Sequence, residues 1–178
     1  MGIANLKASL GDYAKDISLN LDTVLSDTGA PDLTEGQIAG IALASAYATR
    51  NAETVAALED EMAGKLDVAT RRAAKAAATV MAMNNVYYRF IHTVHDEELS
   101  KLPARLRMNV IGNPGIAKLD FELMSLAVSS INGCGMCMES HMHEVLKGGL
   151  TKTGVQSAIR IAATIQAAAQ AAFLSASP

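Results

Sequence analysis

Residues 113–146 read NPGIAKLDFELMSLAVSSINGCGMCMESHMHEVL, and two breaks divide this stretch. Asn113-Pro114-Gly115 is a firm breaker of regular structure, and Asn132-Gly133 interrupts the stretch in its middle. Residues 119–131 and 134–146, on either side of the second break, indicate helices. Here and in the remaining sequence, no alternation of apolar and polar residues marks a strand. We therefore predict an all-helical (all-α) protein.

Further helices are expected on both sides of this stretch, over residues 2–25, 35–50, 51–65, 67–90 and 151–174. Thr34 followed by Gln37 has the spacing of a capping box, which favours a helix start there. The polar segment at 92–105 is expected to form a loop or short helical turns. We predict one helical domain over residues 1–178, with the half that carries the cysteines at about 107–178.

The composition favours closely packed helices and excludes several classes of protein. Of 178 residues, half are apolar and 19% are charged, which excludes a disordered chain. The sequence has 32 alanines and no tryptophan, and alanine favours helix and lets backbones approach. A net charge of −3 and a pI near 5.8 argue against nucleic-acid binding. Because the N-terminus lacks a signal core and no 18-residue apolar run occurs, we expect a cytoplasmic protein without a membrane span.

The sequence also contains a faint internal repeat. KAAATV at 75–80 resembles RIAATI at 160–165, and a register of 84 residues places Ala44-Ser45 opposite Val128-Ser129. In this register the helix that carries the cysteines corresponds to the helix at 51–65, which has none. Alanine-rich helices match one another easily, so a duplicated helical unit and a chance match both stay open.

The two cysteines, Cys134 and Cys137, form a CxxC motif. In a reducing cytoplasm this motif indicates redox chemistry or metal binding rather than a structural disulfide. If the segment from Cys134 is helical, the spacing i, i+3, i+7 places both thiols and the His141 imidazole on one face. A thiol is mostly protonated at neutral pH, so a nearby base or a helix N-terminus must ionise it. This segment offers both, and we interpret the pair as redox-active rather than as core filling.

Zinc binding is the main alternative, because Cys134, Cys137, His141 and His143 are four potential ligands. They crowd into ten residues, whereas structural zinc sites usually draw ligand pairs from two separated segments. On a helix, His143 also points about 120° away from Cys137 and about 160° away from His141. The spacing favours thiol chemistry with no metal bound.

Glu122 lies among apolar residues, twelve positions before Cys134, and has two interpretations. Its carboxylate lies on a solvated helix face, or it reaches His141 across the break at Asn132-Gly133. In the second case it orients the imidazole and stabilises the protonated ring, as the third group of an activated-nucleophile relay.

Residues 113–141 resemble the alkylhydroperoxidase D (AhpD) family, within the wider carboxymuconolactone decarboxylase superfamily. The shared pattern of Glu, eleven residues, CxxC, three residues and His is met by Glu122, Cys134, Cys137 and His141. The resemblance covers almost the whole chain, through similar segments at 5–21, 48–51, 82–89 and 107–116. In one departure from the pattern, Met136 stands where the best-known members have a second histidine.

The resemblance implies an all-helical homotrimer with thiol-dependent alkyl hydroperoxide reductase activity. In the family, the second cysteine attacks the peroxide and becomes a sulfenic acid. The first cysteine donates a proton to the leaving alcohol and then closes the disulfide. Carried over, Cys137 is the peroxidatic residue, and Cys134 is the proton donor and resolving residue. His141 and Glu122 then form the relay that ionises Cys137.

The resemblance also implies a route for electrons. Dihydrolipoyl groups on a 2-oxoacid dehydrogenase component reduce the Cys134–Cys137 disulfide, and the protein can pass electrons to the peroxiredoxin AhpC. NADH enters through a partner enzyme, dihydrolipoamide dehydrogenase. No cofactor is therefore expected on this chain, which fits the absence of a Gly-rich dinucleotide fingerprint.

Other functions stay open from the residues alone. The first alternative is a disulfide reductase for a peroxiredoxin, with weak peroxidase activity of its own. The second is a carboxymuconolactone decarboxylase-like enzyme in which the cysteines are incidental. The third is a non-catalytic helical scaffold or zinc-stabilised module.

Overall fold

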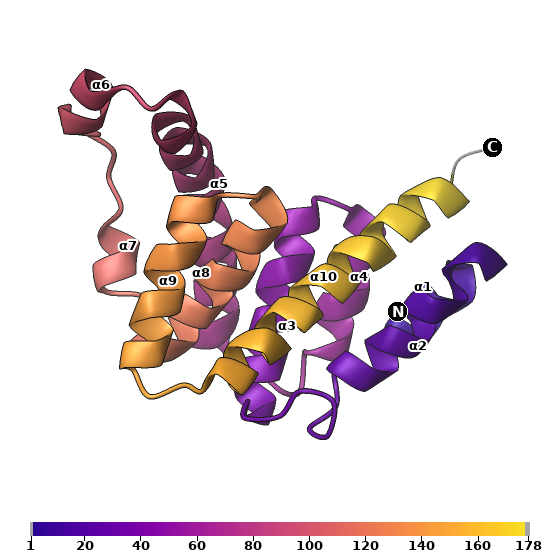
Figure 1. Cartoon of the computed structure of the whole chain (residues 1–178). Helices are drawn as coiled ribbons and strands as arrows, with labels where there is room; N and C mark the ends of the chain where they lie inside the picture. Colours follow the sequence, from indigo (N-terminus) through magenta and orange to yellow (C-terminus); the bar gives the residue numbers. More distant parts are fainter. Residues whose placement is uncertain (1, 177–178) are drawn as a thin grey trace.

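A computed structural model describes residues 2–176, and every regular element in this range is a helix, which confirms the predicted all-α class (Figure 1). The elements in chain order are α1 (Ile3–Ser9), the 3₁₀ helix η1 (Asp12–Ala14), α2 (Lys15–Val24), α3 (Glu35–Thr49), α4 (Ala52–Glu61), α5 (Val68–Val94), α6 (Glu97–Lys101), α7 (Asn109–Gly112), α8 (Lys118–Asn132), α9 (Gly135–Lys147) and α10 (Lys152–Ser175). None of the helices in this range is both long enough and apolar enough to cross a membrane.

The helix α8 lies at the centre of the fold, where it packs against α3, α5, α9 and α10. Its residues 121–129 are buried without interruption. A helix buried on every side is stable only when its surface is almost wholly apolar. The helix α3 is buried in the same way from 38 to 46. Glu122 is the one charged side chain in the buried stretch of α8, so its surroundings must supply a partner.

Side-chain caps begin several of the predicted helices. The capping box expected at Thr34 is confirmed: its Oγ1 accepts the Gln37 N–H, and Gln37 Oε1 accepts the Thr34 N–H. Asp67 caps α5 and Thr151 caps α10, each by accepting an N–H three residues on. Each such cap stabilises its helix by about 1 kcal/mol.

The prediction of one continuous helix over residues 2–25 is wrong. Leu10 and Gly11 are extended and separate α1 from η1 and α2. The Gly11 N–H donates to Ser175 Oγ at 3.1 Å, and Figure 1 shows α1 and α2 beside the end of α10, which both helices contact. These tertiary contacts outweigh the helical periodicity of the N-terminal residues.

The segment after residue 90 differs in part from the prediction. The helix α5 continues to Val94, and the short α6 follows it inside the segment expected to be a loop or short turns. In Figure 1 the chain projects from the body through α6 and returns through α7. This return brings Met108 and Ile111 to the cavity described below.

The order of the helices repeats along the chain. The starts of α3 and α8, of α4 and α9, and of α5 and α10 lie 83, 83 and 84 residues apart. The junctions correspond as well. Arg50 after α3 and Gly133 after α8 are both left-handed, and Asn51 and Cys134 are the N-caps of α4 and α9. The spacing agrees with the register of 84 residues, while the duplication itself stays a prediction.

Gly133 allows the turn between α8 and α9, because its φ of 70° lies in the left-handed region. A Cβ at this position would meet no atom within 4 Å, so only backbone strain opposes a substitution. Gly133→Ala is expected to lower the free energy of unfolding by about 1–2 kcal/mol, measured by urea denaturation. Gly36→Ala is the matched control, since Gly36 is helical and has equally open space. It is expected to keep or raise stability, and an equal loss in both variants would contradict the strain argument.

Candidate active site

Cys134 and Cys137 are joined by a disulfide at the start of α9, with their Cα atoms 5.3 Å apart. The expectation that Cys134 is itself helical is wrong. It is the N-cap of α9, its backbone is extended, and its Sγ accepts the Cys137 N–H at 3.3 Å. The Cys134 N–H donates to the Ser129 carbonyl oxygen at 3.1 Å, which ties the cap to the end of α8. The disulfide therefore lies in a turn that backbone hydrogen bonds connect to α8 before it and to α9 after it.

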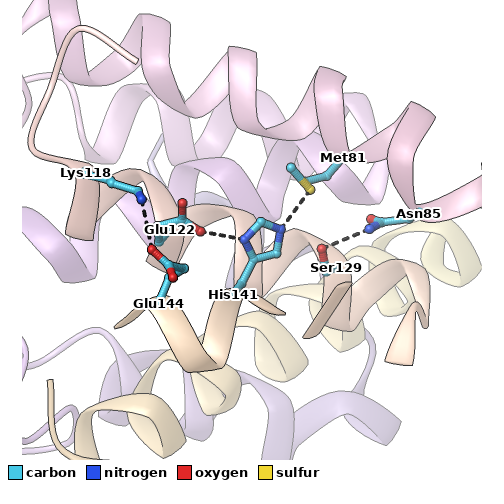
Figure 2. Close-up of polar contacts among 7 residues, drawn as sticks. All are labelled: Met81, Asn85, Lys118, Glu122, Ser129, His141 and Glu144. Atoms are coloured by element: carbon cyan, nitrogen blue, oxygen red, sulfur yellow. Dashed lines mark hydrogen bonds and ion pairs between the residues drawn. The ribbon is translucent and has the colours of Figure 1, made fainter. Parts of the chain in front are cut away.

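A polar network lies behind this turn. Asn85 of α5 is 1% exposed, and its Nδ2 donates to Ser129 Oγ at 2.9 Å (Figure 2). Its Oδ1 accepts from Asn132 Nδ2 at 3.0 Å, and Arg89 donates to the Asn132 carbonyl oxygen at 2.6 Å. A buried network whose members are satisfied is rigid. It therefore fixes the turn relative to α5.

Glu122 is buried, with 4% of its surface exposed, so the interpretation that places it on a solvated face is wrong. Its Oε2 lies 2.6 Å from Nδ1 of His141, which is 7% exposed, and Figure 2 shows the carboxylate and the ring facing one another. A carboxylate in a core needs a hydrogen-bond donor, and the ring N–H is one. The contact spans the Asn132-Gly133 break and fixes the orientation of the imidazole.

The second ring nitrogen of His141 faces a methionine rather than a cysteine. Its Nε2 lies 3.2 Å from Sδ of Met81, a fully buried residue of α5 (Figure 2). Among residues 2–176, His141 has no hydrogen bond to Cys137, although the sequence places both on one face. Carboxylate and thioether are both hydrogen-bond acceptors, so each ring nitrogen faces an acceptor.

A cavity of about 470 Å³ opens onto Cys137 and His141. Its apolar wall is formed by Met81, Tyr88, Met108, Ile111 and Met136. Cys137 lines the cavity and is 6% exposed, whereas Cys134 does not line it and is fully buried. A molecule that enters the cavity therefore meets the sulfur of Cys137 first.

Lys118 and Glu144 form an ion pair in the cavity lining, with Nζ 2.9 Å from Oε2 (Figure 2). The hydrogen bond and charge of Lys118 hold the pKa of the Glu144 carboxyl below its ordinary value. The same hydrogen bond raises the pKa of Lys118. The pair is therefore ionised at neutral pH and adds no net charge to the cavity.

The structure brings together the four residues singled out from the sequence, and it adds others that sequence reasoning did not assign. Met81, Asn84 and Tyr88 of α5 line the same cavity. Their spacing of i, i+3 and i+7 marks one helix face, and two of them lie in the segment 82–89 that carries the family resemblance. The sequence signal was present, but only the packing of α5 against α9 shows what that face meets.

The structure also places Met136 and His143, the two other residues considered from the sequence. Met136, at the departure from the family pattern, lines the cavity with an apolar side chain. His143 is exposed, whereas His141 on the same helix is buried. Among the residues that the structure describes, no group of three or more His, Cys, Asp or Glu side chains is placed to hold a metal ion.

The fold and the site together define a helical protein with a thiol–disulfide centre beside a buried carboxylate–imidazole pair. Residues 97–177 match the model of the carboxymuconolactone decarboxylase family, and this range contains all four residues of the pattern.

Curated relatives extend the similarity over nearly the whole chain. A Coxiella burnetii protein (strain Dugway 5J108-111) named alkyl hydroperoxide reductase AhpD is 52% identical over 168 residues, which cover 94% of this chain and 95% of that protein. Proteins of the same name from Rhodospirillum centenum and Brucella abortus are 53% and 50% identical, each over 95% of this chain and over 89% and 95% of their own lengths. The chain belongs to the alkyl hydroperoxide reductase AhpD family.

Proposed function

We propose that this protein is a thiol-dependent alkyl hydroperoxide reductase whose redox centre is the Cys134–Cys137 pair. One observation carries the proposal: the pair opens through Cys137 alone onto a cavity that His141 and Glu122 also line. The name shared by the relatives supports the same chemistry. The apolar wall of the cavity suits the alkyl part of an organic hydroperoxide.

In the reduced protein, Cys137 is the peroxidatic residue. Its thiolate attacks the terminal oxygen of the hydroperoxide, so an S–O bond forms, the O–O bond breaks and Cys137 becomes a sulfenic acid. The Cys134 thiol gives its proton to the departing alkoxide, which leaves as the alcohol. The Cys134 thiolate then attacks the Cys137 sulfur and closes the disulfide, and the released hydroxide takes a proton to become water.

His141 and Glu122 form the relay that ionises Cys137. After reduction, the His141 Nε2–H is released from Met81 and donates to the Cys137 thiolate, which is the stronger acceptor because it is charged. Glu122 keeps Nδ1 protonated and stabilises the imidazolium. The N-terminal position of both cysteines on α9 adds a further stabilisation of the thiolate.

Dihydrolipoyl groups of a lipoylated 2-oxoacid dehydrogenase component are proposed to supply the two electrons that reopen the disulfide. NADH reaches them through a separate enzyme, and this chain passes electrons on to the peroxiredoxin AhpC. We further propose that the protein acts as a cytoplasmic homotrimer. The apolar cavity leading to Cys137 supports a lipoyl arm as donor, because that arm is a long aliphatic chain ending in two thiols.

The test is consumption of cumene hydroperoxide by the pure protein with dihydrolipoamide as donor, measured with and without a purified peroxiredoxin. Steady turnover without the peroxiredoxin is expected. Turnover that appears only when the peroxiredoxin is added would show a disulfide reductase instead. No consumption of donor under either condition would overturn the redox proposal.

A further inference from the structure

The side-chain oxygen of Asn84, Oδ1, is buried beside the site and has no hydrogen-bond partner among residues 2–176. Only 4% of the residue is exposed. The carboxamide of the next residue, Asn85, is by contrast bonded at both atoms. A buried carbonyl oxygen without a donor is unfavourable, so such atoms are normally satisfied by protein, water or a ligand.

Asn84 lies on the face of α5 that meets the reacting sulfur. Asn84 lies one turn beyond Met81, whose Sδ contacts the ring of His141, so both residues are on the face that meets α9. The backbone oxygen of Asn84 lies 4.0 Å from Cys137 Sγ, and Asn84 lines the cavity together with Cys137 and His141. A molecule bound in the cavity against Cys137 is therefore next to Asn84.

We propose that the Asn84 carboxamide binds the O–O–H group of the hydroperoxide and directs its terminal oxygen toward Cys137. This inference rests on the proposed function. A hydroperoxide carries one O–H donor and two acceptor oxygens, and a carboxamide offers the complementary acceptor and donors. A rotation of the carboxamide toward the cavity lets Oδ1 accept a hydrogen bond from the O–H group, which places the terminal oxygen against the sulfur. In the same position Nδ2 donates to the oxygen attached to carbon.

The same contacts assist the chemical step. While the S–O bond forms and the O–O bond breaks, negative charge develops on the oxygen that leaves as the alkoxide. The Nδ2–H stabilises this charge until the Cys134 thiol supplies the proton. The O–H hydrogen remains on the transferred oxygen, so it becomes the hydrogen of the Cys137 sulfenic acid.

The inference is tested by single-turnover kinetics of the pre-reduced protein with cumene hydroperoxide. Asn84→Ala removes the carboxamide in a residue that favours helix, and Asn84→Leu removes it while keeping the volume. Both variants are expected to lower the second-order rate constant about 10- to 100-fold, the size of one hydrogen bond to a charged group. Asn20→Ala, on the exposed surface of α2, controls for the loss of a helical carboxamide and is expected to react like the wild type.

Alkylation of Cys137 by iodoacetamide, followed by peptide mass analysis, separates binding of the peroxide from activation of the thiol. Iodoacetamide has no O–O–H group, so its rate is expected to change less than about twofold in the Asn84 variants. An equal fall in both reactions would place Asn84 in thiol activation, and unchanged peroxide rates in both variants would also overturn the inference. Failure of the proposed function would give a different result, because the thiols of the wild-type protein itself would then not react with the peroxide.

Discussion

Cys137→Ser is expected to abolish hydroperoxide turnover, with a loss of at least about 10³-fold. Cys137 is the sulfur that lines the cavity, and a serine hydroxyl in its place is far too weak an acid to form the attacking anion near neutral pH. The relay of Glu122 and His141 remains in this variant, so the loss measures the nucleophile itself. Steady-state consumption of cumene hydroperoxide with dihydrolipoamide is the measurement.

Cys134→Ser is the matched control, because it removes the other sulfur of the same pair. After reduction and removal of the donor, this variant is expected to consume one equivalent of peroxide and then stop, with one oxygen atom added to Cys137 by mass spectrometry. Without the resolving thiol the sulfenic acid has no partner in the chain, since the sequence has only two cysteines. One equivalent consumed by Cys137→Ser, with the oxygen on Cys134, would instead make Cys134 the peroxidatic residue.

The local features of the fold follow from the sequence, because each depends on neighbouring residues. The breaker at Asn132-Gly133, the box of Thr34 and Gln37 and the absence of alternation are all short-range signals. The break after Ser9 escaped prediction, since it accompanies a contact with Ser175 at the far end of the chain. Periodicity along one helix carries no information about such a contact.

In the candidate site, too, the residues close in sequence were predicted and those brought in by packing were not. The spacing of Cys134, Cys137 and His141 indicates that they lie close along the chain's course, because all three belong to one turn and the helix that follows it. The contribution of α5 was not predictable, since residues more than 40 positions away reach the site only through packing. The contact of His141 with Met81 was likewise not predictable, because Met81 lies on α5.

The comparison of the two helical units adds a physical reason for the position of Cys134. Asn51 and Cys134 are corresponding N-caps, and each accepts the N–H three residues further on. An N-cap requires only an acceptor side chain and an extended backbone. A thiol placed there keeps the helix start and gains a position one turn before Cys137. The start of α4 thus has a structural cap at the position that corresponds to a disulfide cysteine at the start of α9.

Glu122→Gln is expected to lower the rate of reaction with hydroperoxide about 30-fold at pH 7, because a thiol with the ordinary pKa of about 8.5 is only about 3% ionised there. Glutamine keeps the size of the side chain and its packing in α8 but removes the charge that stabilises the imidazolium. His141 then has no charged partner at Nδ1, and the ring no longer stabilises the Cys137 thiolate. The variant is measured by single turnover of the reduced protein, with circular dichroism to confirm the helical fold.

The pH dependence of this variant gives the sharper result. In the proposed mechanism, the relay of Glu122 and His141 keeps the Cys137 thiolate present near neutral pH. In Glu122→Gln the thiol must lose its proton to solvent, so the rate is expected to rise with pH through about 8.5, the ordinary value for a cysteine. The deficit relative to the wild type therefore shrinks as the pH rises. Glu139→Gln removes the same charge from the exposed face of α9, does not contact His141, and is expected to keep the wild-type profile. A Glu122→Gln deficit that stays constant from pH 6 to pH 10 would show that the carboxylate acts on packing alone, because a lost structural contact does not depend on thiol ionisation.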